Sequence, residues 1–171
     1  MEHLAAASGI TKSSIYHHVP GKEALLRLAL DRAVNALFAV LEELGAAAGR
    51  QIDRVEYVLR QATTVLVEEL PYVTLLLRVR GNTSTERWAI ARRHEFDRQV
   101  STLVSEAARA GELRSDVDAG LATRLLFGML TSVTEWYRPD GSTTPAELAD
   151  ALAGIAFGGL GSTDAPSTTR P

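Results

Sequence analysis

The feature that most limits the fold of this chain lies at its start, where residues 2–22 read EHLAAASGITKSSIYHHVPGK. The order of residue types predicts a helix, a glycine turn, a short second helix and the capped start of a third. Ala5, Gly9 and Ile15 fall where a helix-turn-helix needs a small residue, a turn glycine and an aliphatic plug. The alternative is an αα-hairpin without a partner, because helix–glycine–helix junctions are common.

Helical periodicity continues through the rest of the chain. Helices are expected over residues 22–44, 52–70, 71–81, 85–110, 121–137 and 146–160. The sequence has no stretch with the alternating pattern of a strand, and we therefore predict an all-α protein. The last ten residues, STDAPSTTRP, contain one alanine as their only apolar side chain and are expected to be disordered.

The composition is that of an ordinary globular protein and excludes several classes. Hydrophobic residues make up 46% of the chain and charged residues 23%. There is no apolar run long enough to cross a membrane, and Glu2 and His3 follow Met1 where a signal peptide would be basic and then apolar. Cysteine is absent, which excludes disulfides and thiolate metal sites. We expect a cytoplasmic protein.

The formal net charge of −3 is unevenly distributed along the chain. Residues 1–33 contain four basic and three acidic side chains, whereas the remainder contains fourteen basic and eighteen acidic ones. The sign of this difference allows contact with nucleic acid through the N-terminal part alone.

The segment SIYHHVPGKEALL closely resembles the signature of TetR-family transcriptional regulators. In that family a short recognition helix precedes a tyrosine, an aromatic or histidine pair, and a lysine that opens the next helix. The resemblance is dense over residues 4–30 and is architectural beyond them. It implies a helix-turn-helix domain with its connecting helix over residues 1–44, a ligand-binding and dimerisation domain over 45–161, and a tail over 162–171. The implied function is that of a ligand-responsive, homodimeric DNA-binding regulator, most often a repressor.

The resemblance also assigns the residues that would contact operator DNA. They are Thr11, Lys12, Ser13, Ser14, Tyr16, His17 and Lys22. The family's first helix, which braces the other two, has no counterpart before this motif. Either the natural protein starts upstream, which we favour, or it lacks the brace. We expect the chain as given to bind DNA poorly or not at all, because Leu4 and Ile15 would lose the apolar cover of that helix.

The C-terminal helices are expected to hold a small-molecule pocket and a dimer face. The expected pocket residues are Tyr57, Leu76, Arg80, Trp88, Phe96, Phe127 and Tyr137. The expected interface residues are Leu126, Met129, Leu130, Val133, Leu152 and Ile155. The runs GELRSDVD and WYRPDG look similar to TetR-type regulators that respond to acyl or steroid-derived CoA thioesters, so a hydrophobic or acyl-CoA-like effector is expected.

His94, Glu95 and Asp97 form a charged cluster of the kind that could hold a metal or serve acid–base chemistry. His94 and Asp97 could share a helix face, but Arg93 and Arg98 would repel a cation and no further ligand pair completes a set. A solvated charged face is the better interpretation. The sequence also has no nucleophile elbow, so we expect neither enzyme activity nor a metal or other cofactor. The alternative function is a helical small-molecule binding protein without DNA binding.

Overall fold

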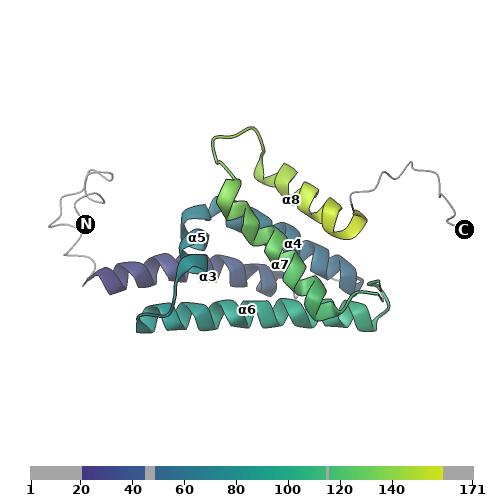
Figure 1. Ribbon diagram of the computed structural model, residues 1–171, viewed down its shortest axis with the longest axis horizontal. Helices are drawn as coiled ribbons and strands as arrows, with labels where there is room; N and C mark the ends of the chain where they lie inside the picture. The colour runs from purple at the N-terminus through teal and green to yellow at the C-terminus, as the bar shows by residue number, and fades with distance from the viewer. Residues whose placement is uncertain (1–20, 45–48, 115, 160–171) are drawn as a thin grey trace, which may run out of the picture.

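The computed structural model describes residues 21–44, 49–114 and 116–159, and these ranges are helical without any strand (Figure 1). The elements are α3 (Lys22–Leu44), α4 (Gln51–Glu68), α5 (Leu70–Arg78), α6 (Ser84–Arg109), α7 (Ala119–Trp136), α8 (Pro145–Ala153) and the π-helical turn η1 (Gly154–Gly158). The all-α prediction is confirmed. Among these helices, none combines the length and apolarity that a membrane crossing requires.

Local sequence explains most helix boundaries. α4 ends at Glu68, and Pro71 lies in the first turn of α5. Proline fits there because a backbone N–H in the first turn has no hydrogen-bond partner within the helix. Gly111 takes a φ of 72° directly after α6, a left-handed conformation that glycine adopts without strain. The helix expected over 146–160 is α-helical only to Ala153 and continues as η1.

Side-chain caps fix the N-termini of the last three helices. The hydroxyl of Thr83 accepts a hydrogen bond from the first turn of α6, and the carboxylate of Asp118 accepts one from α7. Thr144 and Glu147 form a reciprocal capping box at α8, with Thr144 N donating to the Glu147 carboxylate at 2.8 Å.

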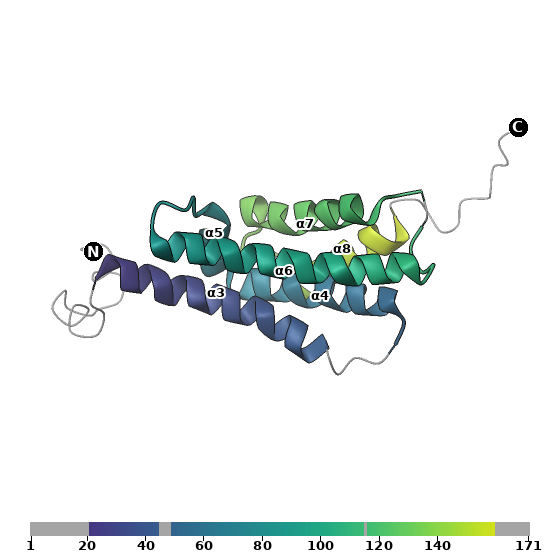
Figure 2. The ribbon, with the colours of Figure 1, turned by 90° about the horizontal axis from the view of Figure 1, so that it is seen from below.

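The helices pack around one core. α3 and α6 run side by side along the length of the molecule, and α7 crosses α6 on the other side (Figures 1 and 2). α5 packs on α3, and α8 packs on α4, where Arg60 forms ion pairs with Glu56 and Asp150. The largest fully buried side chains are Leu30, Leu66, Leu76, Val104, Val133 and Thr63. This core holds α4, α5 and α6 against α3, the first helix of the described residues.

Candidate functional site

An inner chamber lies among α3, α4, α5, α6 and α7 and has a volume of about 130 Å³. Its apolar wall is Leu37, Ala62, Leu66, Val73, Leu76, Leu77, Phe96, Phe127 and Leu130. Its polar lining is Arg93, Asp97 and Thr131. A mostly apolar hollow lined by a few polar groups is the usual form of a small-molecule site.

Arg93 and Asp97, one turn apart on α6, give the chamber its charged lining. Nη1 of Arg93 lies 3.4 Å from the carbonyl oxygens of Leu76 and Leu77, to which it donates at the end of α5. Burial raises the pKa of Asp97 above its ordinary value, and the positive charges of Arg93, His94 and Arg98 act against this rise. The carboxylate is therefore poorly solvated and ready to accept a donor from a ligand.

Two further hollows adjoin the chamber along α7. A narrow cavity of about 20 Å³ shares Ala62, Phe96, Phe127 and Leu130 with the inner chamber. Beyond it, an outer groove of about 250 Å³ lies between α7 and η1 and shares Val55 with the narrow cavity. The free space beside α7 thus consists of two wider parts, the inner chamber and the outer groove. The narrow cavity beside Phe96 and Phe127 lies between them and is called the waist below.

A polar groove between α5 and α7 also adjoins the chamber. It shares Leu77 and Thr131 with the chamber, and its volume is about 380 Å³. Arg78 and Glu135 face each other across it, with Nη2 and Oε1 3.5 Å apart. This groove could hold the polar part of a ligand whose apolar part occupies the chamber.

The structure gathers some of the predicted pocket residues and separates others. Leu76, Phe96 and Phe127 line the chamber. Arg80 is exposed in the connection between α5 and α6.

Three predicted aromatic residues lie elsewhere. Trp88 packs beneath Arg27. The hydroxyl of Tyr57 donates a hydrogen bond to Glu43 at 3.1 Å. Burial raises the pKa of Tyr57, and the hydrogen bond to Glu43 raises it further. The hydroxyl of Tyr137 donates to the carbonyl of Thr143 at 3.1 Å.

Asp97 is a site residue that sequence reasoning missed. The sequence predicts that His94, Glu95 and Asp97 form a solvated charged face, and His94 is exposed. Asp97 differs, because it turns toward the chamber beside Phe96. The spacing of Arg93, Phe96 and Asp97 at three and four residues was the signal for a shared inward face. In the described part of the chain, no group of His, Asp and Glu could hold a metal ion.

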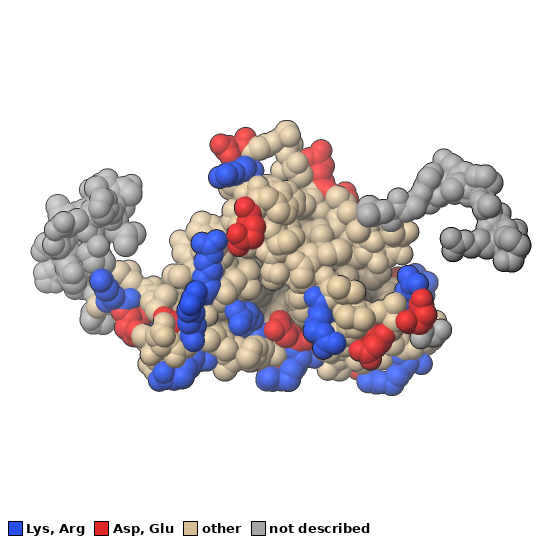
Figure 3. All heavy atoms as spheres, viewed as in Figure 1, with Lys and Arg blue, Asp and Glu red and all other residues tan. Residues whose placement is uncertain are grey.

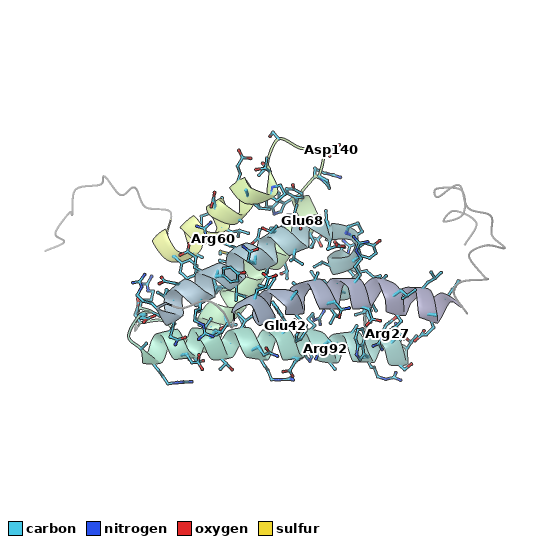
Figure 4. All side chains as sticks on the ribbon, turned by 180° about the vertical axis from the view of Figure 1, so that it is seen from behind. Arg27, Glu42, Arg60, Glu68, Arg92 and Asp140 are labelled. Atoms are coloured by element: carbon cyan, nitrogen blue, oxygen red, sulfur yellow. The ribbon has the colours of Figure 1, made fainter. Side chains whose placement is uncertain are left out.

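Cationic side chains connect α3 to the helices around the chamber. The guanidinium carbon of Arg27 lies 3.4 Å from the centroid of the Trp88 ring, and that of Arg92 lies 3.8 Å from the Phe38 ring. Figure 4 shows Arg27 and Arg92 along the seam between α3 and α6. Phe38 also contacts Phe96 of the chamber wall, with ring centroids 5.9 Å apart. The chamber and α3 therefore share a continuous set of packed side chains.

Carboxylates add two more links to α3. Arg32 forms a two-pronged ion pair with Glu69, the residue that joins α4 to α5, at 2.6 and 2.9 Å. Glu23 accepts a hydrogen bond from the backbone N–H of Thr85 at 3.2 Å. Hydrogen bonds from Thr85 and, to a smaller extent, from Thr83 lower the pKa of Glu23.

The predicted interface residues divide by exposure. Leu130, Val133 and Leu152 are buried inside the subunit, so they offer no surface to a second copy. Leu126 and Met129 are partly buried beside the outer groove, and Ile155 is 41% exposed. The apolar side chains that α7 does expose are Leu121, Leu125 and Trp136. Figure 3 shows a broad uncharged area over α7 and α8 on this face.

The predicted DNA-contacting residues fall almost entirely in residues 1–20, outside the described part of the chain. Those residues are Thr11, Lys12, Ser13, Ser14, Tyr16 and His17. Lys22 is described, and it is exposed at the first position of α3.

Known proteins resemble this chain over most of its length. The family model described as "Tetracyclin repressor-like, C-terminal domain" matches residues 48–160. A TetR-family regulator structure from Streptomyces coelicolor A3 is 55% identical, with a TM-score of 0.84 over 94% of this chain and 82% of that one. The transcriptional repressor KstR2 of Rhodococcus jostii is 26% identical over 93% of this chain and 79% of its own length. The structure of AibR in complex with isovaleryl coenzyme A and operator DNA is 25% identical, with a TM-score of 0.74 over 90% of this chain and 84% of that one.

The relatives are transcriptional regulators and not enzymes, and their similarity includes the helices that enclose the chamber. The alternative of a helical binding protein without a role in transcription is accordingly not favoured. The chain belongs to the TetR family of ligand-responsive transcriptional regulators.

Proposed function

We propose that this protein is a dimeric repressor that is released from operator DNA by a short acyl thioester of coenzyme A. The observation that carries the proposal is the inner chamber, which combines an apolar wall with Arg93 at one side. Arg78 lies in the adjoining polar groove, so a ligand with an apolar end and an anionic end finds matching surroundings. AibR, which was solved with isovaleryl coenzyme A, is a relative with a ligand of this kind.

The links between the chamber and α3 suggest how the effector acts. A ligand that displaces Phe96 or α5 acts on Phe38 and Arg32, which belong to α3. A tilt of α3 would move the helix-turn-helix segments of the two subunits relative to each other. A dimer then no longer fits both half-sites, because their spacing on DNA is fixed. Such a regulator works where the DNA is, and we place it in the cytoplasm.

The DNA and dimer contacts are assigned on the same basis. Lys22, at the start of α3, would hold a DNA phosphate, as would the polar residues of the recognition segment before it. The uncharged face of α7, with Leu121, Leu125 and Trp136, would meet the same face of a second copy. A two-fold axis makes such a face self-complementary.

Effector release of DNA tests this function directly. A form of the protein extended at its N-terminus is titrated with isovaleryl-CoA while bound to a labelled DNA fragment from upstream of its own gene, and fluorescence anisotropy follows release. Isothermal titration calorimetry measures thioester binding without DNA, with CoA and isovalerate as control ligands. Release by the thioester, but not by either control ligand, is the expected result. A chain that binds no CoA thioester in the calorimeter contradicts the proposed effector.

Arg93→Gln identifies the site. The lost charge should weaken thioester binding about tenfold or more, because hydrogen bonds to charged groups are the stronger ones. Arg98→Gln is the matched control: the same change on the same helix, at an exposed side chain that pairs with Glu95. Equal loss of binding in both variants would show that the chamber is not the thioester site.

A further inference from the structure

The waist between the inner chamber and the outer groove is formed by two aromatic rings. Phe96 of α6 and Phe127 of α7 have ring centroids 6.2 Å apart, with their planes at 59°. Both rings line the chamber and the narrow cavity of about 20 Å³, but neither lines the outer groove. The rings therefore stand between two apolar spaces of about 130 and 250 Å³.

The two rings are fixed to different degrees. Phe96 is 4% exposed and is held between Phe127 and the edge contact with Phe38. Phe127 is partly buried, and the next residue, Gly128, has no neighbouring atom within 4 Å of the place where a Cβ would stand. Shortening Phe127 would thus join the two spaces while leaving Phe96 supported by α3.

The volume of the chamber sets a limit on an acyl chain. An apolar cavity of about 150 Å³ accommodates benzene, so a chamber of this size holds roughly five or six carbon atoms. A longer chain meets the waist, whose volume of about 20 Å³ is less than the roughly 25 Å³ per carbon atom that the benzene comparison gives. The outer groove beyond it is apolar and lined by Val55, Val104 and Leu126, among others.

We propose that Phe127 sets the length of the acyl chain this regulator accepts by separating the inner chamber from the groove between α7 and η1. The proposal rests on the acyl thioester effector proposed above. A short branched chain ends before Phe127, whereas a long one is stopped by the ring. When the ring is removed, a long chain extends into the groove, where each buried methylene strengthens binding by about fourfold.

Calorimetry of the full chain with isovaleryl-CoA and decanoyl-CoA tests the proposal. The unaltered protein should bind isovaleryl-CoA at least tenfold more tightly than decanoyl-CoA. Phe127→Ala should narrow or reverse this preference, with a gain of at least tenfold for decanoyl-CoA relative to isovaleryl-CoA. Phe157→Ala, a matched control on the far wall of the outer groove, should leave the preference of the unaltered protein in place.

Two further variants guard against loss of fold. Phe127→Leu retains most of the core volume and should give a smaller gain in the same direction. Phe127→Ala with Ala122→Phe refills the outer groove and should cancel the gain for decanoyl-CoA while isovaleryl-CoA still binds. An unchanged preference in Phe127→Ala and Phe127→Leu overturns the role of Phe127, as does equal binding of both thioesters by the unaltered protein. Absence of binding of either thioester in every variant overturns the thioester effector itself.

Discussion

The guanidinium group of Arg27 on α3 stacks on the indole ring of Trp88 on α6, with 3.4 Å between the guanidinium carbon and the ring centroid. Nε of Arg27 also donates to Asp31 at 2.9 Å, which fixes the guanidinium group over the ring. The contact lies in the N-terminal half of α3, the half nearest the residues that are expected to contact DNA. It ties this half of α3 to a helix that supplies the charged lining of the chamber.

Arg27→Gln should lower the free energy of unfolding by about 0.5–1 kcal/mol, the usual contribution of a partly exposed cation–π contact. Urea denaturation followed by circular dichroism measures the change. Arg138→Gln, an exposed arginine in the connection between α7 and α8, serves as the control and should change stability by less than about 0.5 kcal/mol. Equal losses of unfolding free energy in the two variants would show that the contact between Arg27 and Trp88 does not stabilise the protein.

The helices could be predicted because their boundaries depend on nearby residues. Pro71, Gly111 and the Thr144–Pro145 pair each act within a turn of their own position. The end of the last helix was not predicted correctly. No nearby residue indicates that the helix after Thr144 changes into a π-helical turn at Gly154.

The pocket could be predicted only in part, because apolar character does not distinguish a residue that lines a pocket from one that packs between two helices. Phe96 and Trp88 both lie on α6, eight residues apart. Phe96 lines the chamber, whereas Trp88 contacts Arg27 of α3. Which of the two rings lines the chamber depends on how α3 packs against α6. The same holds for the predicted dimer face, because α7 is apolar almost all round, and Val133 points inward while Leu125 points outward.

Asp97→Asn should stabilise the protein at neutral pH. Burial raises the pKa of Asp97 above its ordinary value of 3.8, so the folded state holds the charged carboxylate at a cost. This cost is present above the raised pKa and is relieved as the pH falls through it toward 3.8, because the folded protein takes up the proton first. Thermal melting at a series of pH values should show the variant more stable at pH 7 and the difference shrinking with acid. A difference that grows on acidification would mean that Asp97 is stabilised as the anion.

Thr144→Ala should lower the free energy of unfolding by about 1 kcal/mol, because it removes the side-chain half of the capping box on α8. Thr102→Ala is the control: its exposed hydroxyl donates to the carbonyl of Arg98 within α6, where alanine is the better helix former. Chemical denaturation should therefore separate the two threonines. An equal or smaller loss at Thr144 would mean that packing of α8 on α4 holds the helix without its cap.

Leu125→Glu should convert the protein from dimer to monomer. Leu125 on α7 is 58% exposed in the single subunit, and its neighbours on the same face include Leu121 and Trp136. Burying a carboxylate against an apolar partner without a counter-ion opposes association strongly. Leu28→Glu is a close control, because Leu28 is also 58% exposed but belongs to α3. Light scattering after size exclusion should give a monomer for the first variant and a dimer for the second, and two dimers would exclude this face of α7 from the interface.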